Sequence, residues 1–154
     1  MLKSLAFAAA MLAAGAAHAG GHVSETGLVT VTSAHDVPTT IDRLAAAVEK
    51  AGGTVFTRVD HAAGAAKVDL ELRPTELLIF GNPKLGTPAM QAAQTMGMDL
   101  PLRAVAWEDE AGVVHLSYTD AATMAARHGI SGDAEFVGKM TGALGKLTGA
   151  ATAE

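Results

Sequence analysis

The feature that most constrains the fold is a change in apolar periodicity around residue 35. Residues 27–33, GLVTVTS, alternate with a period of two, which predicts a strand with valines on one face and threonines on the other. The next segment has apolar residues at helical spacing; Asp36 can cap its N-terminus and Gly52-Gly53 can end it. Its apolar residues are Val37, Ile41, Leu44, Ala45, Val48 and Ala51.

Four further segments are predicted as strands. They are TVFTRVD (54–60), ELLIFG (76–81), PLRAVAWED (101–109) and VVHLSYT (113–119), and the last two flank a hairpin turn. The unbroken apolar run of ELLIFG is typical of a strand that is buried on both faces.

The order of these elements predicts an α+β fold of the β-α-β-β-β-β-α type. We expect two layers, with a mixed or antiparallel sheet, helices packed on one face and an extra C-terminal helix. A short helix should run from Asp120 to Gly129, and the last helix should open at residues 131–133.

The last predicted helix carries two stripes. Its apolar side is Phe136, Met140, Leu144 and Leu147, whereas Gly138, Gly142, Gly145 and Gly149 recur on another side. Each glycine costs a helix about 0.5–1 kcal/mol relative to alanine. Two interpretations stay open: a frayed, weakly helical tail, or a close helix contact such as one across a dimer.

The N-terminal residues have the pattern of an export signal. Lys3 precedes an apolar run from Leu5 to Ala17, and Ala17-His18-Ala19 fits a cleavage site. A membrane anchor is the alternative, but the run is shorter than the ~20 residues that span a bilayer. We therefore expect a periplasmic or secreted protein.

The chain is predicted to have four parts. They are a signal peptide (1–19), a flexible mature N-terminus (20–26), an α+β domain (27–130) and a C-terminal glycine-rich helix or tail (131–154).

Composition excludes several classes of function. The formal net charge of −5 becomes −6 without Lys3, and an acidic chain without basic clusters disfavours nucleic acid as a partner. No second apolar run approaches bilayer length, so no membrane span is expected after processing. The absence of cysteine excludes thiol nucleophiles, cysteine-ligated zinc and covalent c-type haem. No common catalytic fingerprint is present, which favours a protein that is not an enzyme.

The segment FGNPKLGTPAM (80–90) is the first candidate site. A buried strand turns at Asn82-Pro83 into a helix, which would place Lys84 and Thr87 beside unpaired backbone N–H groups. Helix N-termini of this kind bind anions or carboxylates. The alternative is that the same residues form turns without a ligand.

His61 could reach the same end of the sheet if the second and third strands are neighbours. A histidine beside Asp60 could act as a general base, but adjacent strand residues point to opposite faces, so a surface or capping histidine is the competing interpretation.

A third candidate depends on cleavage after Ala19. The mature chain would then begin Gly20-Gly21-His22, which supplies an amine, two amide nitrogens and an imidazole in one plane. Cu(II) and Ni(II) prefer this arrangement. The alternative is an incidental flexible terminus. Met90, Met96 and Met98 could offer thioether ligands to Cu(I) or fill the core.

Four stretches carry a resemblance to a known family: TIDRLAAAVEKAGGTVFTRVDHAAGA, LRPTELLIFGNPKLGTPAMQAA, MDLPLRAVAWED and LSYTDAATMAARHGI. Together they resemble the domain of unknown function 302 from about Val29 to Ile130, most specifically in Gly-Asn-Pro followed by Gly-Thr-Pro. The resemblance implies a compact exported domain that forms a homodimer, and it implies no established activity. We therefore expect an exported binding module that holds a small anionic ligand or partner at the Gly-Asn-Pro-Lys turn through His61, Asn82, Lys84 and Thr87. A Cu(II) or Ni(II) protein is the alternative, and an enzyme centred on His61 is third.

Overall fold

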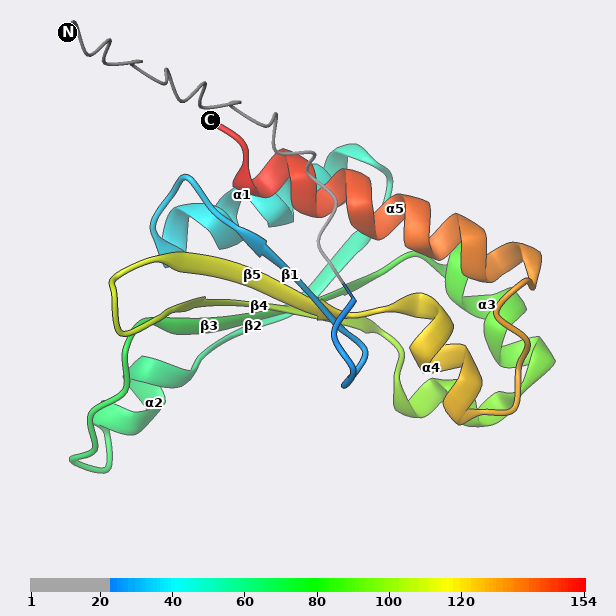
Figure 1. Cartoon of the computed structure of the whole chain (residues 1–154), viewed down its shortest axis with the longest axis horizontal. Coiled ribbons are helices and arrows are strands. Elements are labelled where there is room, and N and C mark those ends of the chain that lie inside the picture. Colours follow the sequence, from blue (N-terminus) through cyan, green and yellow to red (C-terminus); the bar gives the residue numbers. More distant parts are fainter. Residues whose placement is uncertain (1–22) are drawn as a thin grey trace, which may run out of the picture.

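The computed structural model describes residues 23–154, and Figure 1 shows how the elements are arranged. In chain order they are β1 (Leu28–Thr32), α1 (Val37–Lys50), β2 (Thr54–Asp60), α2 (His61–Ala66), β3 (Thr75–Gly81), α3 (Pro83–Ala92), the 3-10 helix η1 (Gln94–Met98), β4 (Leu102–Glu108), β5 (Val114–Thr119), α4 (Ala121–Arg127) and α5 (Glu135–Thr152).

The five strands form one antiparallel sheet in the order β1-β5-β4-β3-β2. Because β1 and β2 lie at opposite edges, the helix that connects them, α1, must cross the sheet. α1 and α5 lie on the same face (Figure 1). The predicted α+β class is confirmed, and the sheet is antiparallel rather than mixed.

Only one face of the sheet is covered by these helices. In β3, Glu76, Leu78 and Phe80 are buried beneath them, whereas Leu77 and Ile79 point to the opposite face and are half-buried. The prediction that ELLIFG is buried on both faces is therefore wrong. Its apolar run fills the core with every second residue and leaves the others on a partly exposed surface.

The core joins α1 to the middle of the sheet. Ile41 and Leu44 are fully buried and belong to the same cluster as Leu78, Phe80 and Leu116. The helix begins as predicted, because the Asp36 carboxylate accepts a hydrogen bond from the Thr39 amide at 2.8 Å. Hydrogen bonding from the Thr39 side chain and backbone amide lowers the pKa of the Asp36 carboxyl.

α5 is an 18-residue helix packed along α1, so the frayed-tail interpretation does not hold. The predicted apolar residues Met140 and Leu144 are buried, whereas Phe136 and Leu147 are only half-buried. The buried side also includes Val137, Thr148 and Ala151. A Cβ atom added at any of the four glycines would meet nothing within 4 Å in the described part of the chain. A close glycine contact between copies stays a prediction.

The C-terminus of α5 is held by two side chains from the N-terminal half of the domain. Arg43 of α1 donates to the carbonyls of Ala150, Ala151 and Ala153 at 2.9–3.2 Å. His35 donates to the Ala153 carbonyl at 2.7 Å. The last carbonyls of a helix lack intrahelical donors and carry partial negative charge, so cationic donors stabilise them.

A second group of polar side-chain contacts connects α4 to η1. His128, which caps the C-terminus of α4, lies 2.9 Å from Asp99 Oδ2 through Nε2 and 2.9 Å from Thr95 Oγ1 through Nδ1. The His128 and Asp99 side chains are only 10% and 12% exposed. Arg127 and Arg103 approach the other oxygen of Asp99 at 3.3 and 3.7 Å.

Replacing Arg43 with alanine should destabilise the domain. Three carbonyls at the end of α5 would lose a charged donor, which should lower the free energy of unfolding by about 1–3 kcal/mol. Urea denaturation measures this change, and Lys50→Ala in the exposed last turn of α1 is the control. An effect of Arg43→Ala no larger than that of the control would contradict the role assigned to Arg43.

Replacing His128 with alanine should also destabilise the domain, by about 1–3 kcal/mol, because the shielded Asp99 carboxylate and Thr95 hydroxyl lose a partner. His61→Ala, at an exposed histidine, should change the same free energy by less than about 0.5 kcal/mol. Equal changes in the free energy of unfolding for the two variants would show that the contacts of His128 with Asp99 and Thr95 do not stabilise the fold.

Candidate functional site

A cavity of about 280 Å³ lies where β3 turns into α3. The turn Gly81-Asn82-Pro83 forms one wall, the segment that leads into β4 forms another, and Met140 of α5 contributes a third side. Most of the lining is apolar, and its largest side chains are Phe56, Leu85, Met90, Leu100, Leu102 and Met140.

Two glycines keep this cavity open. A Cβ atom at Gly86 would lie 3.5 Å from Leu100 Cδ1, and one at Gly81 would lie 3.4 Å from Phe56 and 3.5 Å from Pro101. These are ordinary van der Waals separations, so a methyl group fits at either position. A larger side chain at Gly86 would extend from α3 toward Leu100 and fill space that is now empty.

The polar groups of the turn are engaged within the chain. The Asn82 side chain accepts from the Lys84 amide at 2.9 Å and donates to the Gly52 carbonyl at 3.3 Å. The Asn82 carbonyl accepts from the amides of Leu85 and Gly86, both at 2.9 Å. The expectation that first-turn N–H groups are free for an anion is therefore not met.

The structure brings three of the four predicted ligand-binding residues together. Asn82 and Thr87 line the cavity, and Lys84 lies between them on the exposed side of the first turn of α3. The described residues place no carboxylate within 4 Å of the Lys84 ammonium.

His61 lies at the other end of the sheet. β2 and β3 are neighbours, but they are antiparallel, so Asp60 pairs with Glu76 whereas Thr54 pairs with Gly81. His61 is the exposed first residue of α2, far from α3 in Figure 1. Asp60 caps this helix by accepting from the Ala63 amide, so it does not orient His61. The expectation that His61 joins the turn is wrong.

Two histidines outside the predicted sites have carboxylate partners. The Thr95–His128–Asp99 chain has the order of a hydroxyl, a base and an orienting acid, but these residues are not part of the cavity lining. His115 lies 2.9 Å from Asp109 and stacks against Trp107 at 4.7 Å between ring centroids. The hydrogen bond from His115 lowers the pKa of the Asp109 carboxyl, with help from nearby backbone amides.

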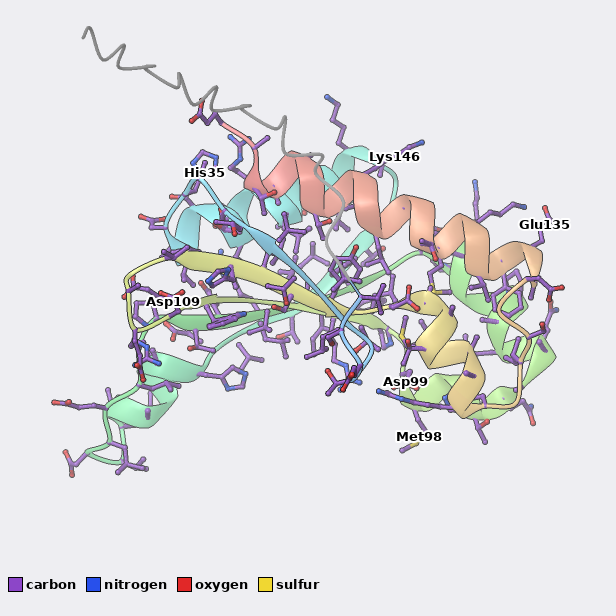
Figure 2. All side chains as sticks on the ribbon, viewed as in Figure 1. His35, Met98, Asp99, Asp109, Glu135 and Lys146 are labelled. Atoms are coloured by element: carbon purple, nitrogen blue, oxygen red, sulfur yellow. The ribbon has the colours of Figure 1, made fainter. Side chains whose placement is uncertain are left out.

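The predicted metal site Gly20-Gly21-His22 lies outside the described residues, so it stays a prediction. Within residues 23–154 no group of three His, Asp or Glu side chains is placed to hold a metal ion. Met96 is buried in the core, Met98 is 80% exposed, and Met90 lines the cavity (Figure 2 labels Met98). These positions favour packing roles for Met90 and Met96.

The chain matches part of longer curated relatives. The chain is 52% identical over 122 residues to "Fluoride-specific ion channel FluC 1" of Brucella suis biovar 1 (strain 1330), which is 78% of this chain and 48% of that protein. The protein of the same name from Brucella abortus biovar 1 (strain 9-941) is 52% identical over 78% of this chain and 45% of its own length. The chain therefore spans about half the length of these relatives. Among the helices of residues 23–154, none is both long enough and apolar enough to cross a bilayer.

The fold is shared with a solved structure. The crystal structure of an uncharacterized conserved DUF302 protein from Bacillus stearothermophilus superimposes with a TM-score of 0.74 at 16% identity, over 81% of this chain and 98% of that one. The family described as "Domain of unknown function DUF302" matches residues 29–147. This match extends past Ile130 into α5, so it includes most of the helix that the sequence predicted as an extra C-terminal element. The chain belongs to the DUF302 family.

Proposed function

We propose that the chain is an extracytoplasmic binding module that holds a small amphipathic ligand at the Gly81-Asn82-Pro83-Lys84 turn. The observation that carries this proposal is the apolar cavity of about 280 Å³ at that turn. Small-molecule sites are concave and mostly apolar, with a few polar groups that fix orientation. The export pattern of residues 1–19 supports the location.

The lining modifies the ligand expected from sequence alone. Because the backbone amides of the first turn already have acceptors, the cavity itself favours the apolar body of a ligand. Lys84 at the edge of the turn is the group that would meet a carboxylate or another negative end. The predicted anionic ligand is therefore best described as an apolar body that carries one negative group.

The affinity expected for such a site is modest. Burying about six methylene groups contributes roughly 5 kcal/mol, at ~0.8 kcal/mol per group, and association costs several kcal/mol of this. Before the cost of association, 5 kcal/mol corresponds to a dissociation constant of about 0.2 mM, so with that cost an eight-carbon probe should bind in the millimolar range. Octanoate and octan-1-ol at millimolar concentration are suitable probes, because they share a chain and differ in charge.

Both probes should raise the thermal midpoint of the mature protein, and calorimetric titration should show one site. Gly86→Leu should remove this binding, because its side chain fills the cavity. Gly64→Leu is the matched control, since Gly64 lies in α2 and a Cβ there meets nothing within 4 Å. Lys84→Ala should weaken octanoate binding about two- to fivefold and leave octan-1-ol unchanged. No binding of either probe, or full binding by Gly86→Leu, would overturn the proposal.

The names of the relatives suggest a second candidate, a role beside a fluoride channel. Fluoride is a small, strongly hydrated anion that needs several hydrogen-bond donors, and the backbone amides of Lys84, Leu85 and Gly86 already have acceptors within the chain. We expect sodium fluoride to shift the thermal midpoint no more than sodium chloride at equal ionic strength. A fluoride-specific shift that Gly86→Leu removes would instead favour this second candidate.

A further inference from the structure

A second hollow adjoins the cavity and extends it along α5. It has a volume of about 440 Å³ and shares Gly81, Asn82, Leu85 and Leu102 with the first, so the two meet over the β3–α3 turn. On α5 the second hollow runs from Gly138 to Leu147. We call this second hollow the α5 groove.

The α5 groove has an apolar floor and a basic rim. Val48 and Phe80 from the core and Leu147 of α5 line it, together with the ammonium-bearing Lys139 and Lys146. Lys139 is paired with Glu135 at 2.6 Å, whereas no carboxylate of residues 23–154 lies within 4 Å of the Lys146 nitrogen. Figure 2 shows Lys146 on the side of α5 that faces away from the sheet.

We infer that the cavity and the α5 groove together hold one extended amphipathic anion of the fatty-carboxylate type, with its tail in the cavity and its negative group beside Lys146. A ligand short enough to lie within the cavity alone would instead place its negative group at Lys84, as proposed above. This inference rests on the proposed function and names the ligand class for the same site.

Size and charge both support this ligand class. The cavity alone is at the lower limit of small-molecule sites, which occupy about 300–1,000 Å³, and the groove brings the site well within that range. Because Lys139 is paired with Glu135, Lys146 is the cation of the α5 groove that can meet the one negative group of such a ligand. A positive rim over an apolar floor complements a carboxylate at the end of a hydrocarbon chain.

Chain length is the first test. In wild-type protein, below the critical micelle concentration of each probe, decanoate should bind at least fivefold more tightly than octanoate, because each added methylene that is buried contributes about 0.8 kcal/mol. Lys146→Ala should weaken decanoate binding about two- to fivefold and leave decan-1-ol unchanged. Equal affinities for octanoate and decanoate would overturn the inference.

Gly142→Leu tests the path of the chain. Gly142 lines the α5 groove and a Cβ there meets nothing within 4 Å, so the new side chain should enter the groove without disturbing the helix. This variant should lose the gain from octanoate to decanoate and keep its octanoate affinity within about twofold. Gly145→Leu makes the same change on the same helix outside the α5 groove and should bind as wild type.

The outcomes separate the two proposals. If neither octanoate nor decanoate binds, the proposed function itself is wrong. If octanoate binds, Gly86→Leu blocks it, and Gly142→Leu changes nothing, the cavity is a site but the α5 groove is not part of it. If Gly142→Leu instead changes the molar mass measured by analytical ultracentrifugation while ligand affinity stays constant, the α5 groove is an interface between two copies and the inference is overturned.

Discussion

The packing of α5 on α1 is the constraint on which the rest of the arrangement depends. Within residues 23–154, α1 and α5 cover the same face of the sheet. Because α1 already occupies the middle of this face, α5 lies against α1 and extends toward α3 and α4. Its C-terminal end is held by Arg43 and His35. Its N-terminal half passes over α3, and the space left between these helices and the β3–α3 turn is the cavity that Met140 and Met90 line.

The cavity is kept open at a cost in stability. Empty apolar space forfeits packing, and glycines within helices forfeit conformational stability. At Gly86, Gly138 and Gly142 a methyl group would fit without a clash, so the monomer fold does not require a glycine at these positions. Departures from good packing and helix propensity are found in natural proteins at functional or strained sites. Gly86 lines the cavity, whereas Gly138 and Gly142 line the α5 groove, and the apolar cavity remains the observation on which the proposed binding site rests.

Local patterns predicted the elements well, because periodicity and capping act over short distances. β2 has the bounds 54–60 that its sequence predicted, and Gly129, with a φ of 69°, follows the end of α4. Contacts between distant segments could not be derived in the same way. Asp99 and His128 are 29 residues apart and meet only through tertiary packing. The direction of pairing decided the position of His61, since an antiparallel partner moves the end of β2 away from the end of β3.

The most direct test of the central claim is a methyl NMR titration of protein labelled at methionine methyl groups. Met90 and Met140 line the cavity, whereas Met124 is buried at α4 and Met98 is exposed on η1. As octanoate is added, the signals of Met90 and Met140 should shift together in a saturable way, and that of Met124 should stay fixed. Unchanged Met90 and Met140 signals, or shifts confined to Met98, would contradict the account.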